Sequence, residues 1–583
     1  MKKILFILLA VSNSLCAQDM KLDPMQIAKR IADRVIRETS FEFTEIEQKP
    51  SFDLQAIDFP KAYNDRNAAN VYAFAKILAP EKINLKFGIS YSEPLKIWIN
   101  DQLVFQNSRP TNFRFKEIAY EMFTYQDTFS VNLNKGENRI IVYSPNSKNS
   151  VVYLREITEA ERKPISKFDP IHQNKKFTWP WCYLAESKMG SSKIINNYPS
   201  KTLLDSLFAE KTFKNYDCII PKPALLEKLT INPLNTFQKD SYADWNYPNG
   251  ILMMSVATLS EAAGDSRYKK FVEKYCDFIS RNLAQFKKQY YKDHDLRGSF
   301  YRIFRKCMLD DAGSPTLPFA EIALVDKTKK YDAILNEMVN YVYQEQSRLN
   351  DGTLCRPEPE KWTVWADDLF MSVPLFVKAA KINHNRKYIN DAVKQVANFN
   401  KYLFDAERGL YKHAWFSKSN EKSKIFWGRA NGWVVWATSE LLANMSKNHS
   451  RYKQIKKIFI DHLNGLIKYQ SESGMWHQIL DDKSSFEETS CTSMFIVGLS
   501  RAIVDGMIDK KYYANVMNAW KALQNNISKD GIVKDICCGT GIGYSTEFYK
   551  TRDRYYNDPR GLGAVIISAI EVSKLQKYLM NNN

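Results

Sequence analysis

The chain is poor in the residues that build metal sites and disulfide frameworks. It holds 9 cysteines and 7 histidines among 583 residues. No Cys-x-x-Cys pair occurs, and apart from the adjacent Cys537 and Cys538 the cysteines lie far apart. Structural zinc sites and disulfide scaffolds need closely spaced ligands or a short, cysteine-rich chain. We therefore expect no metal, no other cofactor and mostly buried thiols.

Long apolar runs are absent from the sequence after its first residues. A basic start at 1–3, an apolar stretch at 4–11 and a small residue at Ala17 predict a signal peptide over residues 1–17. A lipoprotein reading based on Cys16 comes second, because the preceding leucine suits lipidation poorly. No later run has the length of a bilayer span. We expect an exported, periplasmic protein without membrane insertion.

Acidic residues are outnumbered by basic ones, which leaves a formal net charge of +18. An excess of this size favours acidic partners. Nucleic acid is not expected, because the sequence shows no basic run or nucleic-acid motif and because export argues against it. An acidic oligosaccharide is the expected partner, although a diffuse excess also serves solubility. The oligomeric state stays open.

The order of sequence patterns predicts a small all-β domain followed by a large helical one. An amphipathic pattern at 24–38 predicts a short helix, and alternating segments such as 83–89 and 95–99 predict strands of a sandwich. The expected divisions are a signal peptide (1–17), an N-terminal segment with the short helix (18–82), a β-sandwich accessory domain (83–157), a proline-containing connector (158–195) and a helical catalytic domain (196–583).

The helical part repeats. Four segments start at a tyrosine that follows a basic residue, run through a helix and end at a glycine; they are Tyr331–Gly352, Tyr388–Gly409, Tyr452–Gly474 and Tyr512–Gly531. With a looser copy ending at Gly298, successive glycines lie 54 to 65 residues apart, which suits one two-helix hairpin per repeat. Such hairpins form an open solenoid or a closed ring. Six in a ring make an (α/α)6 toroid, the mainly α fold that we expect.

Each repeat glycine is followed, four positions later, by a polar side chain. These side chains are Arg302, Arg356, His413, Gln478 and Asp535. Equivalent positions in a ring face the same place, so we expect them to converge on one funnel mouth. Ordinary loop polarity is the alternative.

Two adjacent acidic residues stand inside an apolar run. Asp367 and Asp368 follow Trp365 closely and precede a leucine and a phenylalanine. A carboxylate in apolar surroundings is costly unless it is paired or protonated, so one interpretation is an acid catalyst with a raised pKa. The other is a helix N-cap. A second pair, Asp310 and Asp311, lies earlier in the chain.

Several ordered motifs resemble those of unsaturated glycuronyl hydrolases of glycoside hydrolase family 105. They span most of 240–575 and comprise Trp365–Met371, Gly409–His413, Trp427–Trp433, Gly474–Gln478 and Glu488–Ser490. The resemblance implies an enzyme that removes a 4,5-unsaturated uronic acid from the non-reducing end of lyase-generated oligosaccharides by enol-ether hydration. Rhamnogalacturonan or pectin fragments are the first expectation, and ulvan or glycosaminoglycan fragments the second. A non-catalytic carbohydrate-binding toroid also stays open.

The same resemblance assigns residues. It implies Asp367 as the general acid/base and Asp310 as the second carboxylate, with Asp311 as the alternative for the latter and Asp368 as structural. Burial beside Trp365 and repulsion from the second carboxylate would raise the pKa of Asp367, whereas the helix dipole would lower it, and the sequence does not decide between the two effects. The expected substrate-binding residues are Trp365, His413, Arg429, Trp433, Arg356, Met371 and Gln478. Phe416 stands where relatives often carry an acidic residue, which leaves subsite specificity open.

Overall fold

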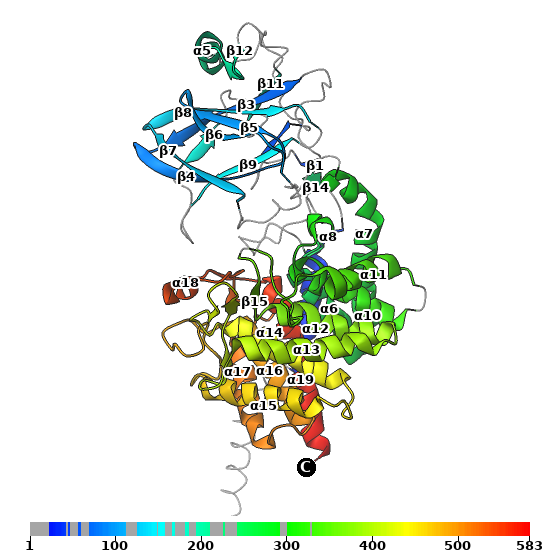
Figure 1. The fold of residues 1–583 in the computed structure, drawn as a ribbon. Helices are drawn as coiled ribbons and strands as arrows, with labels where there is room; N and C mark the ends of the chain where they lie inside the picture. Colours follow the sequence, from blue (N-terminus) through cyan, green and yellow to red (C-terminus); the bar gives the residue numbers. More distant parts are fainter. Residues whose placement is uncertain are drawn as a thin grey trace, which may run out of the picture.

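The protein has a β-rich part and a helical part (Figure 1). The computed structural model describes residues 23–41, 45–46, 56–59, 69–111, 125–147, 150–157, 166–169, 181–185, 194–209, 226–227, 242–291, 300–326, 329–358 and 360–582. The expected signal peptide therefore lies outside the described residues.

Within the described residues, six inner helices form a closed ring in which each packs on the next and the last returns to the first. In ring order they are α6 (Tyr247–Ala263), α10 (Leu317–Val325), α12 (Asp368–Ile382), α14 (Gly428–Asn444), α16 (Thr489–Val504) and α19 (Pro559–Asn581). Nearly every residue of α14 and α16 is buried. A helix that is apolar on most sides suits a position with neighbours on most sides, and this confirms the (α/α)6 toroid.

An outer layer of helices packs around this ring. Its members are α7 (Ser266–Tyr291), α11 (Asp332–Asn340), α13 (Arg386–Leu403), α15 (Tyr452–Lys468), α17 (Tyr513–Leu523) and α2 (Pro24–Glu38). The last of these comes from the N-terminal segment and packs on α19, with Ile27, Ile31 and Val35 buried in the helical core. The helical domain expected at 196–583 is therefore incomplete without residues 24–38. The repeat did not show this, because the sixth hairpin is divided between the two ends of the chain.

The repeat glycines have a backbone reason. Gly352, Gly409, Gly474 and Gly531 all have positive φ, between 70° and 99°, a region that glycine enters without a Cβ penalty. Each follows an outer helix and opens the loop that leads to the next inner helix. These loops meet at the ring end where the inner helices begin.

The β-rich part is a sandwich of two antiparallel sheets that share one apolar core. One sheet has the order β2 (Ala56–Asp58), β9 (Val151–Glu156), β4 (Ile83–Tyr91) and β7 (Asp127–Leu133). The other has the order β10 (Lys167–Asp169), β3 (Asn70–Ala79), β8 (Gly136–Pro145), β5 (Leu95–Ile99) and β6 (Gln102–Asn107), and β11 (Cys182–Ala185) also pairs with β3.

The sandwich extends beyond its expected boundaries of 83 and 157. Strand β3 was missed because most of its residues are buried and its sequence does not alternate; β10 and β11 were missed because they are short. Helix α5 (Lys201–Ala209) also belongs here, since Leu203, Leu204 and Leu207 pack on side chains of the larger sheet. The expected connector (158–195) and the start of the helical domain at 196 shift accordingly.

Short elements complete the structure. They are β1 (Glu45–Ile46), β14 (Leu226–Glu227), β12 (Ile194–Ile195), β13 (Tyr198–Pro199), α8 (Tyr301–Arg305), α9 (Leu309–Ala312), β15 (Thr363–Trp365), β16 (Phe404–Asp405), β17 (Leu410–Tyr411), β18 (Ala414–Phe416), β19 (Glu421–Lys422), β20 (Ile536–Cys537), α18 (Thr546–Lys550) and β21 (Arg554–Tyr555).

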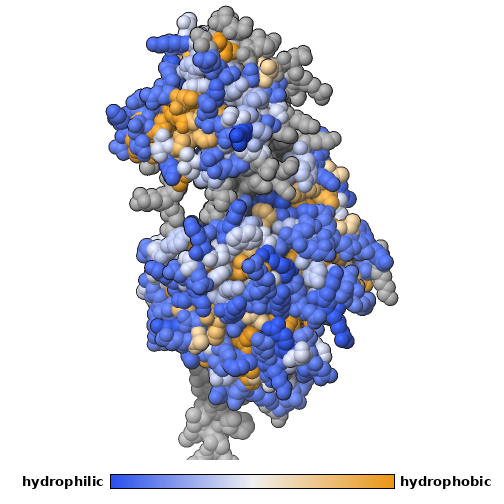
Figure 2. Space-filling model, in the orientation of Figure 1, coloured by the Kyte–Doolittle hydropathy of each residue, from blue (hydrophilic) through white to orange (hydrophobic). Residues whose placement is uncertain are grey.

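Among the described helices, none combines the length and the apolar character that a bilayer crossing needs. Figure 2 shows a largely hydrophilic face over the helical part.

Candidate functional site

Asp367 stands at the start of an inner helix. Strand β15 pairs with β18, the Ala366 N–H donates to the carbonyl of His413, and α12 begins at the next residue, Asp368. Asp367 takes the N-cap position but makes no side-chain cap bond. Its side chain is 14% exposed. The N-cap alternative is therefore correct for its place in the helix, yet the carboxylate is turned to other partners.

His413 is the principal partner of Asp367. Its Nε2 lies 3.2 Å from Oδ2 of Asp367, and its Nδ1 lies 2.7 Å from the hydroxyl of Tyr549. The imidazole is fully buried between Trp365 and Trp427. Neither Nε2 nor Oδ2 has a hydrogen-bond partner among the described residues. Two buried polar atoms thus face each other with their remaining hydrogen-bonding capacity free.

The pKa of Asp367, whose direction of shift the sequence left open, is lowered. Burial pushes it upward, but His413, Arg356 and Arg429 together outweigh burial. The sequence could not show this, since His413, Arg356 and Arg429 come from other loops and from another helix. Asp367 is therefore a carboxylate at neutral pH.

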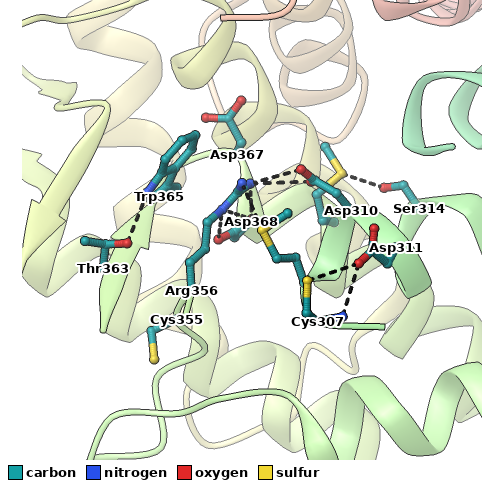
Figure 3. A network of polar contacts seen from close by, with 12 residues as sticks. Cys307, Asp310, Asp311, Ser314, Cys355, Arg356, Thr363, Trp365, Asp367 and Asp368 are labelled. Atoms are coloured by element: carbon teal, nitrogen blue, oxygen red, sulfur yellow. Dashed lines mark hydrogen bonds and ion pairs between the residues drawn. The ribbon is translucent and has the colours of Figure 1, made fainter. Parts of the chain in front are cut away.

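The second carboxylate of the site is Asp310, while Asp311 is engaged elsewhere (Figure 3). Asp310 lies 3.4 Å from the Arg356 guanidinium. Asp311 is fully buried, accepts from Nε of Arg305 at 2.9 Å and from the Cys307 N–H at 3.1 Å. Burial raises the pKa of Asp310, and Arg356 opposes the rise. Of the two adjacent residues, only Asp310 faces the group around Asp367.

Arg356 joins the two acidic pairs. Its Nη2 lies 2.7 Å from Asp368, its Nε donates to the same carboxylate at 2.9 Å, and its guanidinium lies 4.0 Å from the ring centre of Trp365. Asp368 is buried, which raises its pKa to about 7 against the effect of Arg356. Asp368 therefore anchors Arg356, which suits the expected structural role, and Arg356 covers one face of Trp365.

Arg429 is a buried cation with carbonyl partners. It lies in the first turn of α14, is 1% exposed, and donates from Nη1 to the Cys537 carbonyl at 2.5 Å and from Nη2 to the Cys538 carbonyl. Within the described chain no carboxylate is within ion-pair distance of it, and its Nε has no hydrogen-bond partner. Glu488 acts on it electrostatically without reaching ion-pair distance, and because a buried guanidinium without a direct carboxylate partner is costly, this group suits an anionic ligand.

The other expected site residues divide into two groups. Gln478 is buried, donates to the Cys537 sulfur at 3.0 Å, and has an Oε1 without a partner among the described residues. Trp433 instead packs on Phe370, and Met371 accepts from the Ser314 hydroxyl at 3.0 Å. Both are about 1% exposed. The structure thus places Trp433 and Met371 in the wall between inner helices.

The convergence of the repeat loops holds for some members only. Arg356, His413 and Gln478 meet near Asp367, the last through its contact with the Tyr549 carbonyl. Arg302 acts electrostatically on Asp310. Asp535 pairs with Arg554 at 3.1 Å and does not join them.

Two tyrosines in the site were missed. Tyr247, at the start of α6, is acted on electrostatically by Arg429, Asp310 and Asp367, and burial raises its pKa. Tyr549 lies in α18, beyond the last repeat. No repeat or motif marks either position, so only the closed ring brings them to Asp367. Among the described residues, no group of three or more His, Cys, Asp or Glu side chains is placed to hold a metal ion.

The chain is similar to two named hydrolases over more than half of its length. The unsaturated rhamnogalacturonyl hydrolase YesR of Bacillus subtilis (strain 168) is 28% identical over 349 residues, which cover 59% of this chain and 93% of that protein. An unsaturated 3S-rhamnoglycuronyl hydrolase of Alteromonas sp. (strain LOR) is 24% identical, over 54% of this chain and 73% of that protein.

Solved structures share the fold. A possible GH105 member from Salmonella enterica serovar Paratyphi A aligns with a TM-score of 0.51 and 22% identity, covering 58% of this chain and 85% of that one. The model of the family described as Glycosyl Hydrolase Family 88 matches residues 227–576, more than half of the chain. These findings confirm the resemblance read from the motifs: the chain belongs to Glycosyl Hydrolase Family 88, among relatives of the GH105 type.

Proposed function

We propose that this protein is an exported enzyme that removes a 4,5-unsaturated uronic acid from the non-reducing end of rhamnogalacturonan- or pectin-type oligosaccharides. The observation that carries the proposal is the pair of Asp367 and His413, whose facing atoms lie 3.2 Å apart and lack other hydrogen bonds in the described chain. The names of the relatives support the substrate class, because one is an unsaturated rhamnogalacturonyl hydrolase and the other an unsaturated 3S-rhamnoglycuronyl hydrolase.

The electrostatics of the site suit an acidic substrate. Asp367, Arg429 and Glu488 all lie at the N-terminal ends of inner helices. Helix N-termini carry a partial positive charge that favours anions. Arg429 adds a full charge with no carboxylate partner among the described residues. The uronate carboxylate therefore has a natural binding position near Arg429, and charge-assisted hydrogen bonds hold it.

The reaction adds one water across the C4–C5 double bond. Asp367 donates a proton to C4 and activates a water whose oxygen bonds to C5. The hemiketal so formed opens, and the aglycone leaves with a hydroxyl group. An inverting or retaining glycosidase would instead need two carboxylates around the anomeric carbon.

Proton donation by Asp367 requires the pKa to rise when substrate binds. His413, Arg356 and Arg429 keep the pKa of Asp367 low in the structure. A bound uronate brings a like charge, neutralises part of the effect of Arg429 and excludes water, and each change favours the protonated acid. His413, held by Tyr549, fixes the carboxyl group in position.

Export is supported by one covalent feature. Cys182 in β11 is disulfide-bonded, and disulfides persist mainly in oxidising compartments such as the periplasm. The cysteines described as free thiols are Cys276, Cys307, Cys355, Cys491, Cys537 and Cys538. We therefore propose a periplasmic location, with a lipid anchor at Cys16 as the second possibility.

A substrate comparison tests the function. The wild-type protein should abolish the ultraviolet absorbance of the conjugated double bond in lyase-generated rhamnogalacturonan oligosaccharides, and it should leave saturated counterparts intact. Cleavage of the saturated sugars would indicate an ordinary glycosidase. Binding without loss of absorbance would indicate a carbohydrate-binding toroid. Faster turnover of 3-sulfated rhamnosyl substrates would favour the activity named for the Alteromonas relative.

A further inference from the structure

Two aromatic side chains stack at the mouth of the helical ring without a role in the chemistry described above. The rings of Phe416 and Tyr544 have centres 6.3 Å apart and an interplanar angle of 18°. Tyr544 is 62% exposed, and Phe416 is partly exposed. A single exposed aromatic is ordinary. Two nearly parallel rings exposed in this way, one of them on β18, form an aromatic surface.

Strand register connects this surface to Asp367. Thr363 pairs with Phe416, and Trp365 pairs with Ala414, in the β15–β18 ladder. Residues two apart on a strand share a face of the sheet, so Phe416 lies on the same face as Trp365. That face borders the site, because Trp365 contacts both Arg356 and His413. The aromatic surface therefore continues outward from the site on the face that holds Trp365.

Two carboxylates lie next to this surface, and the basic residues Lys361, Lys418 and Lys422 flank them in the sequence. Glu421 on β19 lies directly opposite Phe416 in the ladder and is exposed. Glu360 is close enough to Tyr544 to act on its hydroxyl, whose pKa is raised first by burial and then by this carboxylate. Carboxylates in these places oppose a sulfate or a second uronate by like-charge repulsion. They accept hydrogen bonds from the hydroxyl groups of a neutral sugar without penalty.

We propose that Phe416 and Tyr544 form a subsite for the aglycone sugar, the ring to which the unsaturated uronate is attached, and that this subsite selects a neutral pyranose with an apolar face. The inference rests on the proposed function and names the part of the substrate that it leaves open. A 6-deoxyhexose ring meets the requirement, because its methyl group enlarges the apolar face that packs on aromatic rings.

The test compares two substrates that share the unsaturated uronate. One carries a neutral rhamnose as aglycone, and the other is the methyl glycoside, which has no sugar ring to stack. Tyr544→Ala and Phe416→Leu should each lower the ratio of kcat/KM for the disaccharide over the methyl glycoside by about 5- to 10-fold. The loss should appear mainly in KM, because stacking on the aglycone is equal in the ground and transition states.

Tyr291→Ala is the matched control, since Tyr291 is also an exposed tyrosine, at 54%, but lies on outer helix α7. It should keep the wild-type ratio. If Tyr544→Ala and Phe416→Leu both kept the wild-type ratio of kcat/KM values, with folding verified by near-ultraviolet circular dichroism, the proposal would be overturned.

The charge preference has its own test. Wild-type protein should prefer neutral rhamnose over rhamnose 3-sulfate, and Glu421→Gln together with Glu360→Gln should reduce that preference. A wild-type preference for the sulfated sugar would overturn the proposed selection of a neutral aglycone. If the wild type consumed neither the disaccharide nor the methyl glycoside, the proposed function itself would fail. An unchanged ratio of kcat/KM values in the variants, by contrast, would refute only the aglycone subsite.

Discussion

The triplet of Asp310, Arg356 and Asp368 leads to a prediction about stability and pH. Two buried carboxylates share one guanidinium here, at 2.7 Å for Asp368 and 3.4 Å for Asp310. Burial raises the pKa of Asp368 to about 7, although Arg356 opposes the rise. An aspartate in the unfolded chain has a pKa of about 3.9. Between these values the folded protein holds more protons than the unfolded chain.

This linkage sets the sign and the size of the effect. The stability contributed by Asp368 is complete below the unfolded pKa and is lost as pH rises through the folded pKa. The slope is at most about 1.4 kcal/mol per pH unit, so about 3 pH units correspond to roughly 4 kcal/mol as an upper bound. Asp368→Asn removes the titrating group and keeps its shape, so the free energy of unfolding of the variant should depend less on pH in this range.

Urea unfolding at several values between about pH 4 and about pH 7 measures the difference. Asp310→Asn should flatten the dependence too, because it removes the like charge that opposes ionisation of Asp368. Asp535→Asn is the control, since it breaks a more exposed pair with Arg554 and should keep the wild-type slope. A wild-type slope in both Asp368→Asn and Asp310→Asn would refute the reasoning, because the triplet would then hold no extra proton.

Two further predictions concern activity. Arg429→Ala and His413→Ala should each lower kcat/KM by about 10- to 150-fold, because Arg429→Ala loses the proposed charge-assisted hydrogen bond to the uronate, of about 1.5–3 kcal/mol, and His413→Ala loses a contact of similar strength that positions the Asp367 carboxyl group; wild-type efficiency in both folded variants, in steady-state assays on one unsaturated disaccharide, would contradict the proposed site. Exhaustive EDTA treatment should leave activity unchanged, since no metal is expected, and a loss that calcium or zinc restores would reveal a metal site.

The helical hairpins could be predicted from the sequence because the glycines that end them meet a local backbone requirement. A repeat glycine at positive φ, as at Gly409, fixes each loop between hairpins, and such a requirement is visible in one chain. Helix 24–38 was predicted as an element, but its place was not, since packing on α19 joins opposite ends of the sequence. Strand β3 escaped because buried strands lose the alternation that marks half-buried ones.

The sequence predicted which residues form the site better than it predicted their pKa values. Asp367 and His413 follow from motif and repeat, yet the lowered pKa of Asp367 depends on a 3.2 Å contact between separate loops. The choice between Asp310 and Asp311 needed coordinates, because adjacent residues of a helix point about 100° apart. Trp433 and Met371 share motifs with site residues but face neighbouring helices, which a linear motif cannot distinguish.

The most direct test of the proposed chemistry is the turnover of Asp367→Asn on lyase-generated unsaturated rhamnogalacturonan oligosaccharides, followed by loss of ultraviolet absorbance. Asparagine keeps the shape of the side chain but cannot donate the proton or accept one from water. The proposed mechanism predicts a folded variant whose kcat falls by at least about 100-fold, while Asp535→Asn keeps wild-type turnover. Near-native turnover in folded Asp367→Asn would contradict the assignment and move the acid/base role to Asp310.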